Sequence, residues 1–401
     1  MTATEQPQAG RPEASSSKRR FSLPPWWEKA LFPLFIGFAI LLPFFYDSGA
    51  PFIEDCVLAL AYVVMALGLN IIVGFAGLLD LGYVAFYAFG LMATGWWASD
   101  FFSSVNKEEG IHIGVSEFAG VLPGIHLNFL LVVVVAMILC AIAGILIGLP
   151  TLRLRGDYIA IVTLAFGEII YVFAVNGDSI NLFSEDYRLT ASRQGITPVD
   201  LVKIPGVEQF TQLNLRPWYW LVLALTLIVL FCVIRLRDSR LGRAWIALRE
   251  DEVAAASMGV PLVKTKLMAY AVGAAIGGIS GAFQASFLNT VNADQFKFSF
   301  SIFVLAMVIL GGLGSIWGVV VGAVALSFIN NRLIPDILND VPSKIGLDFD
   351  LTELSFGIFG FLLVIMMVLR PEGLLPERRR KLELTEGIGT DTEGDLVEVR
   401  A

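Results

Sequence analysis

The sequence predicts an all-α fold, a polytopic membrane helix bundle of about ten transmembrane segments in which some helices are broken or re-entrant. Two observations predict it. Of the 401 residues, 56% are hydrophobic and 16% are charged, and the mean hydropathy is +0.73, whereas a soluble domain needs far more charge on its surface. Apolar runs of the length that crosses a bilayer, about 20 residues in a helix, also recur along most of the chain.

The expected spans follow from this length, and one of them is interrupted. The stretch 299–331 is too long for a single helix and is broken at Gly-Gly-Leu-Gly-Ser, Gly311 to Ser315. We therefore expect two short crossings or a re-entrant pair there. The other spans are predicted near 29–47, 54–74, 80–98, 128–149, 157–176, 218–235, 266–287 and 353–369.

Lysine and arginine indicate which side of the membrane each end of the chain occupies. Cytoplasmic segments next to membrane helices are enriched in both residues, and basic clusters lie within 1–28 and after residue 369. An even number of crossings puts both ends, with most of the 28 Lys and Arg residues, in the cytoplasm. We expect a disordered cytoplasmic N-terminal tail at 1–28, a transmembrane domain at 29–375 and a polar cytoplasmic C-terminal tail at 376–401.

Composition and motifs exclude several classes of function. The net charge of −8 provides no basic surface for nucleic acid. The sequence contains no GxxxxGK[ST] phosphate loop, no HExxH motif and no nucleophile paired with a base, so we expect neither an enzyme nor a metal site in this chain. A carrier driven by an ion gradient typically has several paired charges inside its spans, whereas this chain offers the lone Glu168.

A charged segment stands out from this apolar background, ALREDEVAAASMGVP, within the predicted cytoplasmic loop 236–264. Asp238 or Ser239 is suited to begin a helix there, and Gly259 followed by Pro261 is suited to end it. Such an amphipathic helix docks either in the groove of a partner protein or on the membrane surface, and the residues alone leave both open. Its apolar side is formed by Trp245 and Leu248, and its charged side by Arg249, Glu250, Asp251 and Glu252.

Polar residues and glycines inside the spans are candidates for a transport pathway. Glu168 lies in the middle of 157–176, where a carboxylate costs about 2.5 kcal/mol or more unless it faces the bundle interior or a partner. We expect it to face inward with Thr163, either as a substrate contact or as a hydrogen bond between helices. Asp80 is a further candidate, within the run GFAGLLDLG that begins at Gly74.

Glycines interrupt the spans at two places. Broken helices at membrane depth are tolerated only where the backbone lines a cavity or is covered by protein. Their exposed N–H groups suit a carboxylate and their carbonyls an ammonium group, so we predict pathway positions there, with close helix packing as the alternative at each glycine. The predicted positions are Gly74, Gly77, Gly311, Gly312 and Gly314.

Two predicted outer segments have different character. The segment 177–216 is long for a bundle connection and is a candidate docking surface for another protein. The insertion near 100–127 contains His112 and His126 without metal-ligand spacing, and we expect it to be a solvated loop.

Several motifs together resemble one family. The segment SRLGRAWIALREDEVAAASMGVPLVKTKLMAYAVGAAIGGISGAF, Ser239 to Phe283, resembles the coupling loop and following helix of ABC importer permeases for branched-chain amino acids. The family's two alanines, three residues and glycine are present as Ala254, Ala255 and Gly259; Val253 replaces the usual opening glutamate, with Glu252 one place earlier. Further similar segments are NIIVGFAGLLDLGYVAFYAFG at 70–90, LRLRGDYIAIVTLAFGEII at 152–170, ILGGLGSIWGVVVGA at 309–323 and LRPEGLL at 369–375.

The resemblance implies the ABC importer permease fold and a division of labour in a bacterial cell membrane. An extracytoplasmic binding protein delivers leucine, isoleucine or valine, and this chain forms the pathway with a second permease subunit. Two cytoplasmic ATPases hold ATP and Mg²⁺, while this chain binds no cofactor. A urea or short-amide permease stays the alternative, since the usual paired glycines are replaced in LTASRQGI, Leu189 to Ile196. The residues implied in ATPase coupling are Trp245, Arg249, Glu250, Glu252, Ala254, Ala255 and Gly259.

Overall fold

A computed structural model gives the fold of residues 37–103, 110–115, 122–152, 154, 156–179, 188–204, 210–338, 355–369 and 373–375. The chain divides into two units, Met1–Phe45 and Tyr46–Ala401. In the first unit, a helix that runs to Leu41 is followed by the 3₁₀ turn η1 (Leu42–Phe44). The predicted tails at 1–28 and 376–401, and much of the predicted span 29–47, lie outside the described residues.

The second unit is built from apolar helices, and six helical segments of its described part are long and apolar enough to cross a membrane. This confirms the predicted polytopic helix bundle. Most helix bounds fall close to the predicted spans because each apolar run ends at polar residues, glycine or proline. The helices are α2 (Pro51–Leu69) with its π-helical continuation η2 (Asn70–Phe75), α3 (Val84–Trp97), α4 (Phe129–Thr151), α5 (Asp157–Asn176), α6 (Arg216–Arg237), α9 (Leu262–Leu288), α10 (Phe298–Gly311), α11 (Ile316–Phe328) with π-helical η8 (Ile329–Leu338), and α13 (Ser355–Leu369).

The predicted interruption of 299–331 is confirmed. Helix α10 ends at Gly311, and α11 begins after Ser315, whose Oγ accepts a hydrogen bond from the N–H of Gly318 at 3.1 Å. The two helices pack closely, because a Cβ atom on Gly322 would lie 2.7 Å from the N atom of Gly311. The long apolar run is therefore two short helices folded against each other.

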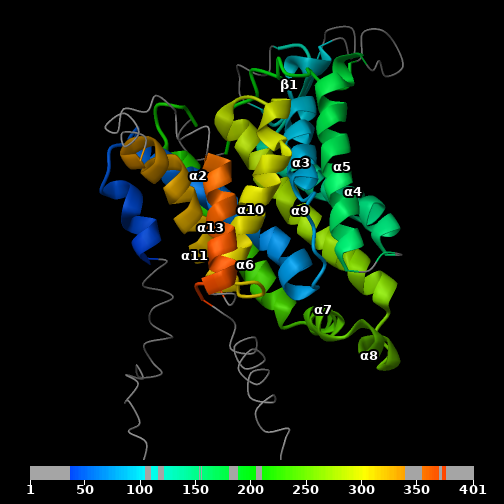
Figure 1. Cartoon of the computed structure of the whole chain (residues 1–401). Helices are drawn as coiled ribbons and strands as arrows, with labels where there is room; N and C mark the ends of the chain where they lie inside the picture. Colours follow the sequence, from blue (N-terminus) through cyan, green and yellow to red (C-terminus); the bar gives the residue numbers. More distant parts are fainter. Residues whose placement is uncertain are drawn as a thin grey trace, which may run out of the picture. The chain divides into compact units, whose positions relative to one another are not determined.

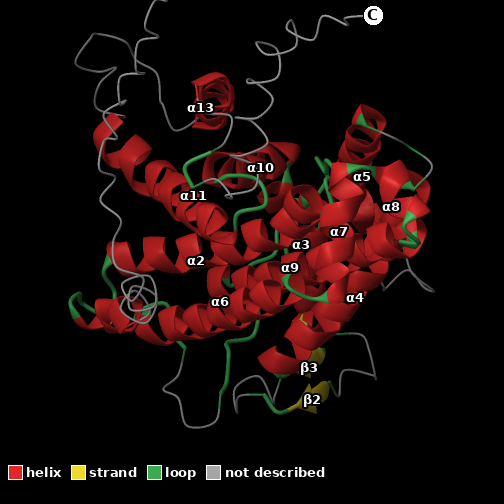
Figure 2. Ribbon diagram, turned by 90° about the horizontal axis from the view of Figure 1, so that it is seen from below, coloured by secondary structure: helices red, strands yellow, loops and turns green. Residues whose placement is uncertain are grey.

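Helix α9 is at the centre of the second unit and contacts α2, α3, α4 and α6 (Figure 2). Small residues allow these contacts: a Cβ atom on Gly278 would lie 2.6 Å from Cys140 Sγ. Buried hydroxyl groups also form hydrogen bonds to α9: Tyr83 donates to the Gly273 carbonyl at 2.8 Å, and Tyr87 donates to Gln284 at 2.7 Å. Small residues and paired hydroxyls are typical of helix interfaces in membranes.

The two ends of α9 define the two ends of the bundle (Figure 1). The short helices α7 (Arg240–Glu250) and α8 (Glu252–Ser257) directly precede it. At its other end, Val291 is bridged to Ile196, near a small sheet of order β1-β3-β2. In this sheet, β1 (Ala98–Ser99) is antiparallel to β3 (Ile125–Leu127), and β2 (Ile111–Ile113) is parallel to β3. The 3₁₀ turns of the second unit are η3 (Asp100–Phe102), η6 (Gly177–Ser179) and η7 (Ala293–Phe296).

Candidate coupling and pathway site

The charged loop forms two helices, and the prediction of one continuous helix is wrong. Ser239 caps α7 by accepting a hydrogen bond from the Gly242 N–H at 3.2 Å, as predicted. The backbone of Asp251 is extended, and its carboxylate accepts hydrogen bonds from the N–H groups of Val253 and Ala254 at 2.7 and 2.9 Å. An aspartate at this position stabilises a new helix start, so α8 begins where the predicted helix was expected to continue.

Helix α7 is fixed to α9 by its apolar side. Trp245 and Leu248 are buried, as the pattern predicted, and the Trp245 indole N–H donates to the Thr265 carbonyl at 2.8 Å. Glu252, at the start of α8, forms an ion pair of 2.7 Å with Lys266, a residue that is itself buried. The two short helices are therefore joined to the start of α9 at two points.

Gly259 follows α8 and stops it as predicted, with a φ of +83°. The N–H of Gly259 donates to the Ala256 carbonyl at 2.9 Å, and the N–H of Val260 donates to the Ala255 carbonyl at 3.1 Å. This pattern stops a helix and requires the left-handed conformation that glycine adopts without strain. Val253 and Met258 are 67% and 86% exposed, so α8 presents apolar side chains at the end of the bundle.

Arg249 lies on the protein side of α7, unlike its neighbour Glu250, which is exposed. Its Nη1 donates to the Gly74 carbonyl at 2.6 Å. Gly77, in the break between η2 and α3, has a φ of +70°, and a Cβ atom there would lie 2.6 Å from Arg249 Cγ. Arg249 therefore joins two groups of residues that the sequence analysis had kept separate, the coupling loop and the first helix break.

The two helix breaks are in contact through Asn70, which the sequence analysis missed. Its Oδ1 accepts a hydrogen bond from the Gly314 N–H at 3.0 Å, and Asn70 is buried. Its signal is a polar amide inside the apolar run 54–74, a residue type that forms hydrogen bonds between membrane helices. The second break is also covered by the segment 373–375, where Leu374 N–H donates to the Leu310 carbonyl at 2.8 Å.

Asp80 and Thr163 come together just before the start of α3. The Leu81 N–H donates to Thr163 Oγ1 at 3.1 Å, and the Ser301 hydroxyl donates to the Leu81 carbonyl at 2.6 Å. Asp80 accepts a hydrogen bond from the Gly82 N–H at 2.9 Å. Since Asp80 and Thr163 are both buried, these contacts join the start of α3 to α5 and α10.

Glu168 is separate from both groups. It is half-buried and shares one strip of α5 with Ala165 and Val172, three residues before it and four after it, which are exposed. The opposite side of α5 carries the buried Thr163 and Gly167. Among the described residues, Glu168 is therefore not on the inward side of α5, and it has no hydrogen bond or ion pair to them.

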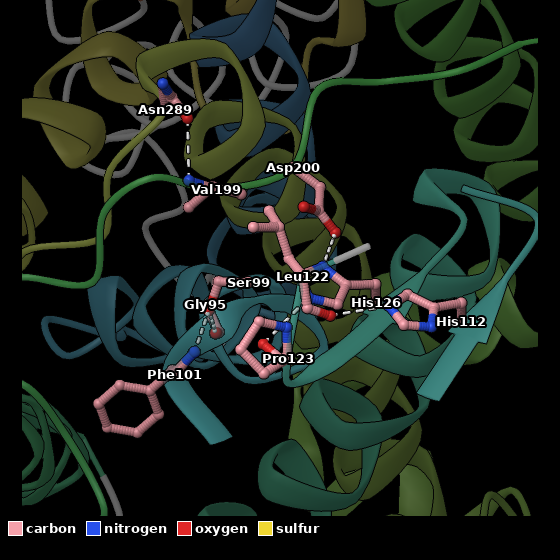
Figure 3. A network of polar contacts seen from close by, with 10 residues as sticks. All are labelled: Gly95, Ser99, Phe101, His112, Leu122, Pro123, His126, Val199, Asp200 and Asn289. Carbon is pink, nitrogen blue, oxygen red and sulfur yellow. Dashed lines mark hydrogen bonds and ion pairs between the residues drawn. The ribbon is translucent and has the colours of Figure 1, made fainter. Parts of the chain in front are cut away.

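A histidine pair at the sheet end corrects one prediction. His126 is buried, not solvated, and its Nδ1 lies 2.7 Å from Asp200 Oδ2 (Figure 3). The rings of His112 and His126 are stacked, with their centroids 5.3 Å apart. The Nε2 atom of His112 donates a hydrogen bond to the Leu122 carbonyl at 2.8 Å. Burial raises the pKa of the Asp200 carboxyl, and the hydrogen bond from His126 acts in the opposite direction. The contact between His126 and Asp200 attaches the segment 188–204 to β3.

Taken together, the apolar helices of the described residues define a multi-pass membrane protein. Residues 54–367 match the family model described as branched-chain amino acid transport system / permease component. The chain belongs to this family. Membership confirms the predicted class of transport subunit over that of an enzyme.

Individual relatives agree with the family. The chain is 34% identical over 369 residues to the high-affinity branched-chain amino acid transport system permease protein LivM of Escherichia coli. The aligned region covers 87% of this chain and 75% of that protein. LivM of Salmonella typhimurium is 33% identical over the same shares. The permease protein LivH of Salmonella typhimurium is 26% identical over 156 residues, 39% of this chain and 46% of that protein. No solved structure matches the chain.

Proposed function

We propose that this chain is a permease subunit of an ATP-driven importer that carries leucine, isoleucine and valine across the bacterial cell membrane. The family and the names of the relatives support this substrate class over urea or short amides. The observation that carries the proposal is the geometry of α7 and α8. The two helices are fixed to α9 by Trp245 and Lys266, and α8 exposes Val253 and Met258.

Such a helix pair suits force transmission, because it moves together with the membrane helix to which it is joined. In this proposal two cytoplasmic ATPases bind ATP and Mg²⁺ and dock on α8 around Ala254 and Gly259. The α7–α8 end is then cytoplasmic, which agrees with the basic residues Arg235 and Arg237 in the last turn of α6. Both termini are placed on the same side by the positive charges of the two tails.

The sheet end is extracytoplasmic in this arrangement, and the segment 188–204 receives the substrate-binding protein there. Hydrogen bonds hold this segment on both sides: His126 contacts Asp200, and the Val199 N–H donates to Asn289 Oδ1 at 2.8 Å. A pre-formed surface loses less conformational entropy when a partner docks.

A second permease subunit completes the pathway, in line with the similarity to LivH. We place it against the exposed strip of α5. A carboxylate on a membrane helix usually faces a water-filled cavity or a partner, and Glu168 finds no partner among the described residues of its own chain. The pathway then runs between Glu168 and the second subunit.

Uptake of labelled leucine by cells with and without this chain tests the proposal. We expect uptake that requires the chain, continues when the proton gradient is collapsed while ATP is maintained, and is inhibited by unlabelled isoleucine and valine but not by urea. Loss of uptake on collapse of the gradient would indicate an ion-coupled carrier instead. Inhibition by urea would shift the substrate to the alternative class.

Replacing Glu168 with glutamine tests the position of the pathway. We expect Glu168→Gln to lower the rate of leucine uptake by about fivefold or more, with the amount of assembled complex unchanged, because the side-chain size is kept and the charge is lost. Glu54→Gln is the matched control, since Glu54 is an exposed carboxylate in the first turn of α2. Equal uptake in both variants would assign Glu168 a structural role only.

A further inference from the structure

The guanidinium of Arg249 reaches an irregular part of the backbone. Its hydrogen-bond acceptor, the Gly74 carbonyl, belongs to the last turn of η2. The hydrogen bonds beyond it are also not α-helical, because the N–H of Ala76 donates to Ile71 and that of Leu78 donates to Ile72. Carbonyl groups at a helix end lack an intrahelical donor, and π-helical turns occur frequently at functional sites. A charged side chain from the loop supplies the missing donor here.

Gly77 provides the space for this contact. Its φ of +70° turns the chain after η2, and the Arg249 side chain passes the position where a Cβ atom would be, 2.6 Å from Arg249 Cγ. A side chain at position 77 therefore requires Arg249 to move. The contact depends on both Gly77 and Arg249, so a substitution of either residue tests it.

The same turn is joined to the second helix break. A Cβ atom on Gly74 would lie 2.7 Å from the Gly314 N atom, and Asn70 accepts a hydrogen bond from that N–H at 3.0 Å. Leu374 also contacts the second break, because its N–H donates to the Leu310 carbonyl. Arg249 is thus linked to Gly74 by a hydrogen bond, and the turn that contains Gly74 is linked to Gly314 by the Asn70 side chain.

We propose that Arg249 is a positioning residue of the transport cycle, which transmits the movement of α7 and α8 to the two helix breaks through the Gly74 carbonyl. The inference rests on the proposed function, because the ATPases impose that movement. Arg243 provides the contrast on the same helix. It is exposed, and its Nη1 donates to the Asp238 carbonyl at the start of the same loop at 2.8 Å.

The first experiment measures leucine transported per ATP hydrolysed by the complete importer in proteoliposomes. We expect Arg249→Ala to lower this ratio by about tenfold, and Arg243→Ala to change it by less than about twofold. Gly77→Ala displaces Arg249 and is expected to lower the ratio as well. The double variant Gly77→Ala, Arg249→Ala is then no worse than the poorer single variant, because residues acting through one contact are not additive.

The second experiment follows the helix break without substrate. In a chain whose Cys56, Cys140 and Cys232 are replaced by alanine, the thiol introduced by Leu79→Cys reports the break, where Leu79 is 37% exposed. We expect a non-hydrolysable ATP analogue to change its labelling rate, and Arg249→Ala to abolish the change. Arg243→Ala is expected to retain it.

The outcomes separate the two proposals. Absence of leucine transport by the unmodified importer would refute the proposed substrate, while the labelling experiment would still decide the role of Arg249. An Arg249→Ala importer with the normal ratio of leucine to ATP and a normal labelling response would overturn the inference. The inference would also be overturned if the losses in the leucine-to-ATP ratio multiplied in the double variant. It would be overturned as well if the ATP analogue left the labelling rate unchanged in the Leu79→Cys chain that retains Arg249.

Discussion

Replacing Gly82 with alanine is expected to destabilise the folded permease by about 3 kcal/mol, at the upper end of the range for overpacking. A Cβ atom on Gly82 would overlap the Thr163 carbonyl oxygen and lie 2.7 Å from the Thr163 carbonyl carbon. These are backbone atoms of α5, so no side chain can rotate away to make room. The start of α3 and helix α5 must separate, and the hydrogen bond from Leu81 to Thr163 is lost with them.

The thermal unfolding midpoint of the purified chain in detergent measures this effect. Gly360→Ala is the matched control, because Gly360 lies in α13 and, apart from the backbone of its own helix, no described atom lies within 4 Å of the place that its Cβ atom would occupy. Alanine is favoured over glycine in a helix interior by up to about 1 kcal/mol, so we expect the control to keep or raise the midpoint. A Gly82→Ala chain that unfolds at the parent temperature would contradict the close approach of α3 and α5.

Local patterns predicted the features that depend on neighbouring residues in the sequence. Apolar runs located the helices, the glycines of 311–314 located the break between α10 and α11, and the spacing of Trp245 and Leu248 identified the buried side of α7. In each case the determining signal lies within one or two helical turns.

The remaining features depend on residues that are distant in the sequence. Arg249 was assigned to the charged side of its helix, but its contact is a carbonyl in η2, 175 residues away. The buried His126 likewise depends on Asp200, 74 residues later. A helical pattern separates polar from apolar positions, but it does not reveal which distant backbone group lacks a donor. Asp251 is different, because aspartate is a local helix-start signal, but it was assigned to the charged side of one continuous helix.

Glu168 illustrates a third case, in which the single chain is an incomplete environment. The cost of a buried charge predicted an inward orientation, yet α5 has an exposed strip on the side where Glu168 lies. In the proposed assembly, the second permease subunit completes the wall beside Glu168. The same holds for Val253 and Met258 of α8, whose exposure suits a partner protein.

Replacing Gly259 with tryptophan is expected to abolish leucine uptake by preventing ATPase association, while membrane insertion is retained. Apart from its chain neighbours, no described atom lies within 4 Å of the position of a Cβ atom on Gly259, so the side chain begins in open space. It has two effects outside the bundle: the φ of +83° becomes strained, which loosens the end of α8, and a large side chain projects from the proposed docking surface. Substitutions of the interface residues that carry most of the binding energy weaken binding by about tenfold or more.

Co-purification of the ATPases with the detergent-solubilised permease measures the association. Gly259→Asn is the conservative variant, because asparagine also ends helices in the left-handed conformation, and we expect it to retain the ATPases. Gly156→Trp is the positional control: Gly156 has a φ of +58° and, apart from its chain neighbours, no described atom within 4 Å of its Cβ position, but it precedes α5 instead of ending α8. If Gly259→Trp and Gly156→Trp retained the ATPases equally, α8 would not be the docking helix, because strain and bulk at a comparable exposed glycine would have had the same consequence.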